Sequence, residues 1–82
     1  MIPPRYRFSG VALREARKAR GMSLHQVVSQ LAKWGLPCTV ESLRRYELGI
    51  AEPRVTLIFR VAYVLRRTPE HFMRDPDSLS EV

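Results

Sequence analysis

The side chains best suited to chemistry in this sequence are two adjacent arginines, Arg44 and Arg45, in a segment that starts at Thr39 and stops at Gly49. A guanidinium group presents a planar set of donors that matches the edge of guanine and the oxygens of phosphate. Threonine is a favoured helix N-cap and glycine a favoured C-terminal stop, so both arginines fall on one short helix. The pattern predicts a helix that reads the major groove of duplex DNA.

Within this helix, the outward positions are candidates for contacts with base edges. Leu43 and Tyr46, three residues apart, are expected to face inward. Arg45 lies between them, so it faces outward and can form a fork onto guanine O6 and N7. Glu41 either accepts from a cytosine amino group or is favoured in the first turn by the helix dipole alone. Val40 either touches a thymine methyl group or is merely exposed beside the cap.

The sequence offers no arrangement of residues typical of catalysis. It has no Ser/His/Asp set, no glycine-rich phosphate loop and no carboxylate pair with an evident pocket, so we predict that the protein is not an enzyme. His25 and His71 lack metal-ligand spacing, and the single Cys38 excludes an intrachain disulfide and a cysteine-cluster zinc site. We therefore expect no metal and no cofactor. Cys38 is interpreted as a small packing residue rather than a thiol switch.

The composition favours a polyanionic partner for a single small domain. The formal net charge of the 82 residues is +6, and arginine supplies nearly all of the positive charge. Basic residues are concentrated in residues 5–20, whereas most of the charged residues in 68–82 are acidic. No apolar run reaches the length of a signal peptide or a membrane span, so we expect a soluble cytoplasmic protein that is nucleoid-associated when bound to DNA.

Helix punctuation and apolar periodicity predict an all-α fold of five helices. The expected ranges are about 10–20, 23–34, 40–48, 53–66 and 69–74, between a flexible basic arm (1–8) and a flexible acidic tail (75–82). Ser23 and Gln26 have the spacing of a capping box at the start of the second helix. The core residues expected from the fourth helix are Val55, Ile58, Val61, Ala62 and Leu65.

Four segments, taken in order, resemble the XRE family of helix-turn-helix proteins, which includes Cro and the lambda repressor. They are LREARKARGMS at 13–23, RYELG at 45–49, EP at 52–53 and VA at 61–62. The resemblance covers roughly residues 10–73. It implies a compact lambda-repressor-like domain, here with five helices, in which the second and third helices form the DNA-reading motif.

The resemblance also implies roles for individual residues. The exposed recognition positions match Thr39, Val40, Glu41, Ser42 and Arg45, while Arg44 faces either the backbone or a base. The start of the second helix, including Ser23 and His25, matches a phosphate-binding position. Arg17 and Glu47 match a structural ion pair between the first helix and the end of the third. The remaining candidates for phosphate contacts, or for a solvated basic face, are Arg5, Arg7, Arg14 and Arg20.

Two features depart from the family pattern. Leu24 stands where many members have a glutamine that contacts phosphate. The segment from residue 28 to residue 39 is also about five residues longer than the corresponding segment in most family members, as in a variant with an extended second helix. This extension leaves the orientation of the third helix open. Trp34, at the end of that helix, either packs over the core or joins Leu36 in a self-association contact.

We expect sequence-specific duplex-DNA binding by a transcriptional regulator, a repressor of phage or mobile-element origin. The expected partners are double-stranded DNA and a second copy, as a homodimer on an inverted-repeat operator, with no membrane and no small-molecule substrate. The alternative is a protein-interaction module, such as an antitoxin or a regulator of another transcription factor. In that case, replacing Arg44 and Arg45 with alanine would leave DNA affinity unchanged.

Overall fold

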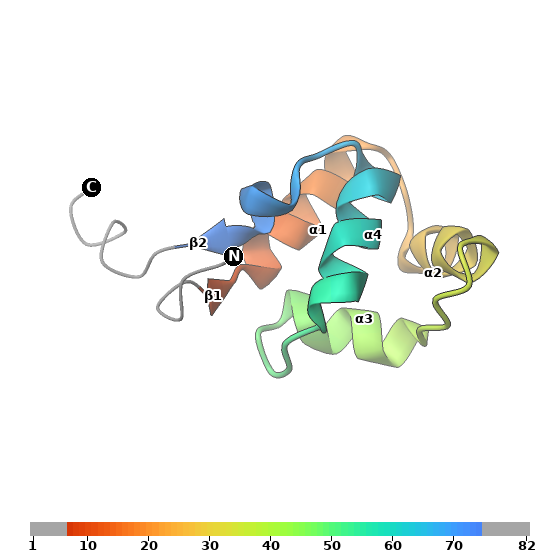
Figure 1. Ribbon diagram of the computed structural model, residues 1–82, viewed down its shortest axis with the longest axis horizontal. Helices are drawn as coiled ribbons and strands as arrows, with labels where there is room; N and C mark the ends of the chain where they lie inside the picture. Colours follow the sequence, from red (N-terminus) through yellow and green to blue (C-terminus); the bar gives the residue numbers. More distant parts are fainter. Residues whose placement is uncertain (1–6, 75–82) are drawn as a thin grey trace.

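Four α-helices and a short strand pair make up the part of the chain that the computed structural model describes, residues 7–74 (Figure 1). The helices are α1 (Gly10–Ala19), α2 (Leu24–Lys33), α3 (Val40–Glu47) and α4 (Val55–Leu65). A 3₁₀ turn, η1 (Pro69–Phe72), and the strands β1 (Arg7–Phe8) and β2 (Met73–Arg74) complete the fold. None of the helices in this part of the chain is both long and apolar enough to cross a bilayer.

Three of the helices begin at hydroxyl side chains, as their sequences predict. Ser9 Oγ accepts from the backbone N–H of Ala12 at the start of α1, at 3.1 Å. Ser23 and Thr39 cap α2 and α3 in the same way. Such caps satisfy N–H groups that have no partner within the helix. After α3, Gly49 adopts a φ of 75°, a left-handed conformation that favours glycine and ends the helix.

The prediction of a fifth helix over residues 69–74 is wrong. Only Pro69–Phe72 is helical, as a single 3₁₀ turn, and Met73–Arg74 is extended. This strand pairs antiparallel with Arg7–Phe8, which we had assigned to the N-terminal arm. The N–H of Ser9 also donates to the carbonyl of Phe72 at 2.6 Å. The pairing joins the two ends of the described chain, so neither strand shows a signal in its own local sequence.

The core draws apolar side chains from all four helices and from the 3₁₀ turn. It consists of Ala12, Leu13, Ala16, Val27, Leu31, Leu43, Ile58, Val61, Ala62, Val64, Leu65 and Phe72. Four of the five core residues predicted on α4 are confirmed, but Val55 is 57% exposed. Val55 is the first residue of α4 and lies on the side away from the core, whereas Val64, which we did not predict, is buried.

The first turn of α1 lies directly against the last turn of α3 at Gly10. A β-carbon at this position would overlap the carbonyl oxygens of Tyr46 and Glu47. Any larger residue would therefore force the two helices apart, because backbone atoms cannot move aside as a side chain can. The absent side chain thus helps to set the position of α3 on the domain.

Candidate nucleic-acid interface

The outer face of α3 carries three exposed charged side chains. Glu41, Arg44 and Arg45 have the i, i+3, i+4 spacing that places residues on one face of a helix, and all three are exposed. On the opposite face Leu43 is fully buried and Tyr46 packs against the core, which confirms the predicted inward positions. Glu41 in the first turn and the arginines near the end also suit the helix dipole.

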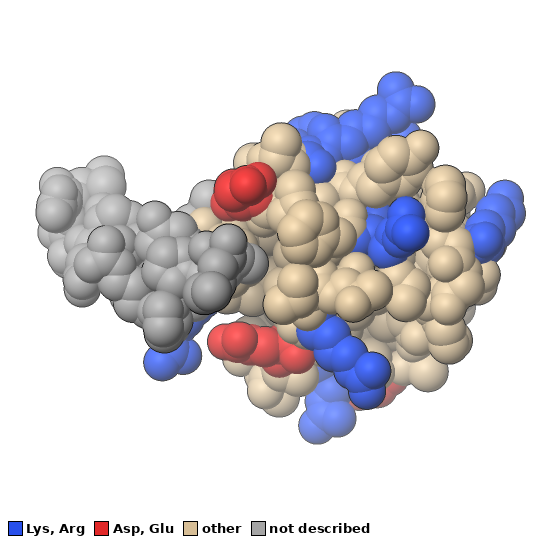
Figure 2. Space-filling view, in the orientation of Figure 1, with Lys and Arg blue, Asp and Glu red and all other residues tan. Residues whose placement is uncertain are grey.

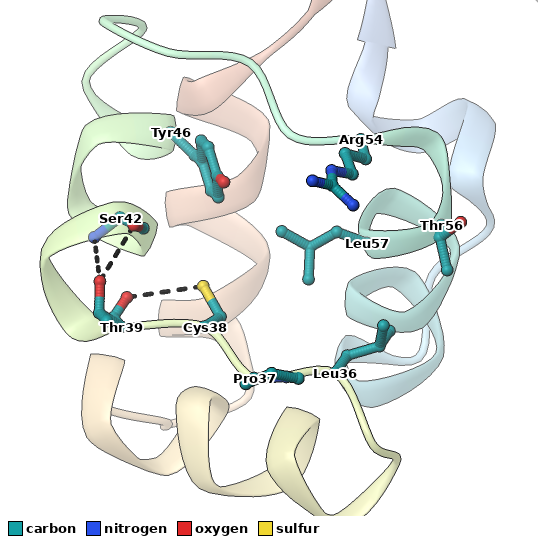
Figure 3. A pocket seen from close by; sticks show the side chains of 9 residues that line it. All are labelled: Leu36, Pro37, Cys38, Thr39, Ser42, Tyr46, Arg54, Thr56 and Leu57. Carbon is teal, nitrogen blue, oxygen red and sulfur yellow. Dashed lines mark hydrogen bonds between the residues drawn. The ribbon is translucent and has the colours of Figure 1, made fainter.

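Three other candidates for base contacts lie at the start of α3 and are partly committed to local structure. The Thr39 hydroxyl accepts from the Ser42 N–H and donates to Ser42 Oγ, both at 3.0 Å (Figure 3). Thr39 is exposed, but Val40 and Ser42 are only half-exposed. Contacts from all three residues to bases stay predictions, and the hydroxyls would have to reach a base while they maintain the cap.

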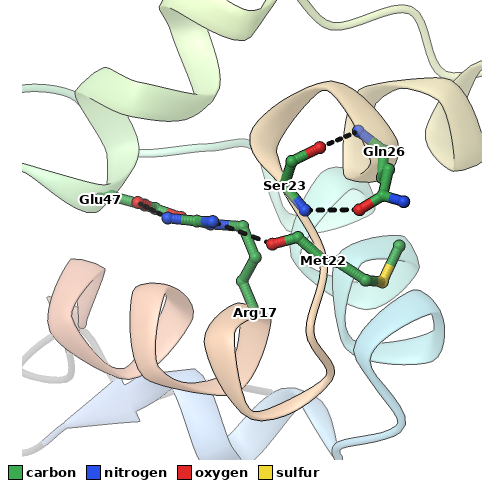
Figure 4. Close-up of polar contacts among 5 residues, drawn as sticks. All are labelled: Arg17, Met22, Ser23, Gln26 and Glu47. Atoms are coloured by element: carbon green, nitrogen blue, oxygen red, sulfur yellow. Dashed lines mark hydrogen bonds and ion pairs between the residues drawn. The ribbon is translucent and has the colours of Figure 1, made fainter.

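The start of α2 has the predicted capping box. Ser23 Oγ accepts from the Gln26 N–H at 3.1 Å, and the Ser23 N–H donates to Gln26 Oε1 at 2.7 Å (Figure 4). Ser23 and His25 are exposed, whereas Leu24 packs against the core. Leu24 therefore has a packing role at the position where the resembled family often has a glutamine. The helix start still offers backbone N–H groups and a positive dipole end to an anion.

A nearly buried ion pair holds α3 against α1. Arg17 Nε lies 2.6 Å from Glu47 Oε2, and Arg17 Nη2 lies 3.1 Å from Glu47 Oε1 (Figure 4). Arg17 Nη1 also donates to the Met22 carbonyl at 2.9 Å. The two side chains are 12% and 6% exposed. This bidentate pair has the partners that the family resemblance implies, and it links α1, the turn before α2 and the end of α3.

One surface hollow brings α1, α2 and α3 together next to this ion pair. It is lined by Arg14, Arg17, Leu24, Arg44, Glu47 and Leu48. Arg14 and Arg44 are exposed, and the carboxylate of Glu47 is already paired with Arg17. The hollow therefore presents two exposed guanidinium groups beside the start of α2. This places one predicted phosphate contact, Arg14, next to the outward face of α3.

Two further arginines predicted to contact phosphate, Arg7 and Arg20, do not line this hollow. Arg20 lines a different hollow together with Trp34, Tyr63 and the end of α4. Arg7 is exposed on β1, and Arg5 lies outside the described residues. Among the three of these arginines that the structure describes, Arg14 is the one that borders the same hollow as an α3 arginine.

A groove between the starts of α3 and α4 was not foreseen (Figure 3). It is lined by Leu36, Pro37, Cys38, Thr39, Ser42, Tyr46, Arg54, Thr56 and Leu57. Arg54 is an exposed cation near the recognition positions of α3. The sequence shows only that Arg54 directly precedes α4. It does not show that Arg54 lies beside α3.

We expect the Cys38 thiol to react slowly with iodoacetamide at neutral pH. Burial raises the pKa of the Cys38 thiol, because desolvation disfavours the thiolate, and its Sγ lies 3.5 Å from the Thr39 carbonyl. The thiolate is the reactive form, so the rate should increase with pH and reach its half-maximum at a higher pH than for free cysteine. The rate in urea, where the burial is lost, is the control. Equal rates in folded and unfolded protein would contradict this expectation.

Across residues 7–74, no three His, Cys, Asp or Glu side chains meet in an arrangement that would hold a metal ion. Comparisons with family models, with curated proteins and with solved structures gave no match.

Proposed function

We propose that this protein binds duplex DNA sequence-specifically as a transcriptional regulator, with α2 and α3 as a helix-turn-helix of the lambda-repressor type. The observation that supports the proposal most is the outward face of α3, where Glu41, Arg44 and Arg45 are exposed side by side. A major groove about 12 Å wide admits an α-helix, and these side chain types match guanine and cytosine edges.

The attachment of α3 to the rest of the domain suits this role. Base readout requires donors at fixed positions, so the reading helix must be held rigidly. Here the nearly buried Arg17–Glu47 pair and the close approach at Gly10 both fix the last turn of α3 against α1. The start of α2 and Arg14 lie beside the same surface, where they can contact phosphates and set the register of α3 on the duplex.

In this proposal the protein is a cytoplasmic repressor that acts at the nucleoid. One copy reads about half of a symmetric operator, so we propose that two copies bind an inverted repeat with half-sites about 34–36 Å apart. The competing proposal, a protein-interaction module, draws support from the exposed apolar residues of α4. The two functions differ in whether Arg44 and Arg45 are needed for DNA binding.

Selection from a random duplex library at about 150 mM salt tests the proposal, since this is close to physiological ionic strength. We expect the purified protein to enrich one sequence motif, arranged as an inverted repeat. A variant with both Arg44→Ala and Arg45→Ala should lose the enrichment while keeping its thermal stability, because both side chains are exposed. Absence of enrichment by the unaltered protein would reject sequence-specific binding and favour the interaction module.

A further inference from the structure

The side of α4 that faces away from the core is also apolar. Val55, Phe59 and Tyr63 are 57%, 54% and 62% exposed, and their spacing of four residues aligns them in one stripe along the helix. Trp34, at the end of α2, is 45% exposed and meets the Tyr63 ring edge-on, with 5.1 Å between ring centroids. A helix that is apolar on both sides is normally covered on both sides.

These four residues form a continuous surface, which we call the α4 face. Figure 2 views the molecule from the side of α4 and shows a largely uncharged surface, with basic side chains on it and around it and acidic side chains towards the left. Val55, Phe59 and Tyr63 line a shallow hollow together with Thr56 and Arg60. The Arg60 guanidinium lies over the Trp34 ring, 5.1 Å from its centroid. Aromatic residues with arginine are typical of the centres of protein interfaces.

We propose that the α4 face joins two copies of this chain, with their α4 helices antiparallel across a two-fold axis. Antiparallel pairing puts the two α3 helices at opposite ends of the dimer, because α3 lies beside the start of α4 (Figure 1). The proposal therefore goes beyond the function proposed above and concerns a contact other than the pairing of two DNA-reading helices on one operator. Self-association itself does not depend on DNA binding, so it can be tested separately.

The shape of the α4 face favours an antiparallel pair. The face is broad at one end, where Trp34 packs on Tyr63, and narrow at the other, where Val55 stands alone. A two-fold axis near Phe59 places the broad end of each copy on the narrow end of the other. Val55 of each copy then faces Tyr63 of the other, so a small side chain meets a large one at both ends while the two Phe59 rings meet near the axis.

The charges at the two ends of α4 are complementary in the same arrangement. Exposed Glu52 precedes the narrow end and exposed Arg66 follows the broad end. Arg54, which also lies near the narrow end, lines the groove beside α3. Antiparallel helices bring Glu52 of each copy towards Arg66 of the other and oppose the two helix dipoles. Parallel helices would instead place like charges together.

The area of the α4 face indicates a weak, reversible pair. An aromatic side chain offers about 150–250 Å², so the three half-exposed rings contribute roughly 300 Å² per copy. With Val55 and the margin, the interface buries on the order of 1,000 Å² in total, at the low end for protein pairs. We therefore expect monomers in dilute solution and dimers at high concentration.

Sedimentation equilibrium without DNA, from about 1 μM to about 1 mM protein, tests the proposal over the range in which weak complexes dissociate. We expect the average mass to rise towards two chains. The emission of Trp34, the only tryptophan, should shift to shorter wavelength over the same range. Phe59→Asp should remain monomeric. Val11→Asp alters an apolar residue on α1 that is at least as exposed as Phe59, and this variant should behave as the unaltered protein.

Circular dichroism melts of both variants establish that they are folded. A chain that stays monomeric to about 1 mM, or a Phe59→Asp variant that still dimerises, would overturn the proposal. The two proposals can fail separately. A protein that dimerises through the α4 face but selects no operator would contradict only the proposed DNA function.

Discussion

Replacing Glu47 with alanine is expected to lower the free energy of unfolding by about 3–5 kcal/mol, because the change leaves a nearly buried arginine charge without a partner. Glu47 is the bidentate partner of Arg17, at 2.6 and 3.1 Å, and both side chains are largely screened from water. In a domain of this size, 1 kcal/mol corresponds to about 4–8 °C in the melting temperature. The thermal midpoint should therefore fall by more than about 10 °C.

A matched change on the same helix separates this effect from a general loss of charge. Glu41→Ala removes an exposed carboxylate from the first turn of α3 and should cost less than about 1 kcal/mol. A double variant, Arg17→Met with Glu47→Leu, removes both charges and should recover much of the loss, since no unpaired buried charge remains. A midpoint shift of less than about one degree for Glu47→Ala would show that the pair has no structural role.

Replacing Arg45 with alanine is expected to lower affinity for each half-site of the selected operator by about 5- to 150-fold, the range of one lost bidentate contact with guanine. Because the side chain is exposed on the outer face of α3, the fold should be unaffected. The loss should also relax sequence preference at one base pair of each half-site. Fluorescence anisotropy with operator duplexes that vary at that position measures both effects.

Variants of the other arginines distinguish base readout from phosphate contact. Log affinity falls with log salt by about 0.9 per phosphate contact, so Arg14→Ala should reduce that slope by about one and weaken all sequences equally. The same measurement on Arg44→Ala decides between its two assigned roles. Lys33→Ala, an exposed cation at the end of α2, is the control and should change little. If Arg45→Ala weakened every sequence to the same extent, readout of guanine by Arg45 would be excluded.

Local sequence was sufficient to predict the helices that carry the candidate interface. The caps at Ser23 and Thr39 and the stop at Gly49 involve residues within one turn of each other, so their chemistry can be recognised without the fold. The inward positions Leu43 and Tyr46 followed from helical periodicity in the same way. The Arg17–Glu47 pair spans thirty positions, and it was predicted from a family resemblance rather than from spacing.

Other features depend on which segments meet in space. Arg14 and Arg20 looked equivalent as basic residues of α1, yet they border different hollows because they lie on different parts of its surface. Periodicity identified one apolar side of α4 and included Val55 in it. The pattern could not show that the packing of the other elements would leave Val55 exposed. Strand β2 lies where the end of a fifth helix was expected, and β1 lies in the expected N-terminal arm. Local sequence could not predict their pairing, because the two strands lie at opposite ends of the described chain.

The sequence by itself thus determined the four α-helices, their caps and the charged outer side of α3, because these depend on interactions within a few residues. The tertiary structure alone decided the close approach at Gly10, the grouping of Arg14 with Arg44 and the exposure of the α4 face. A periodic pattern tells which residues share a side of a helix. Only the packing of the other elements decides which sides are covered and which remain open to a partner.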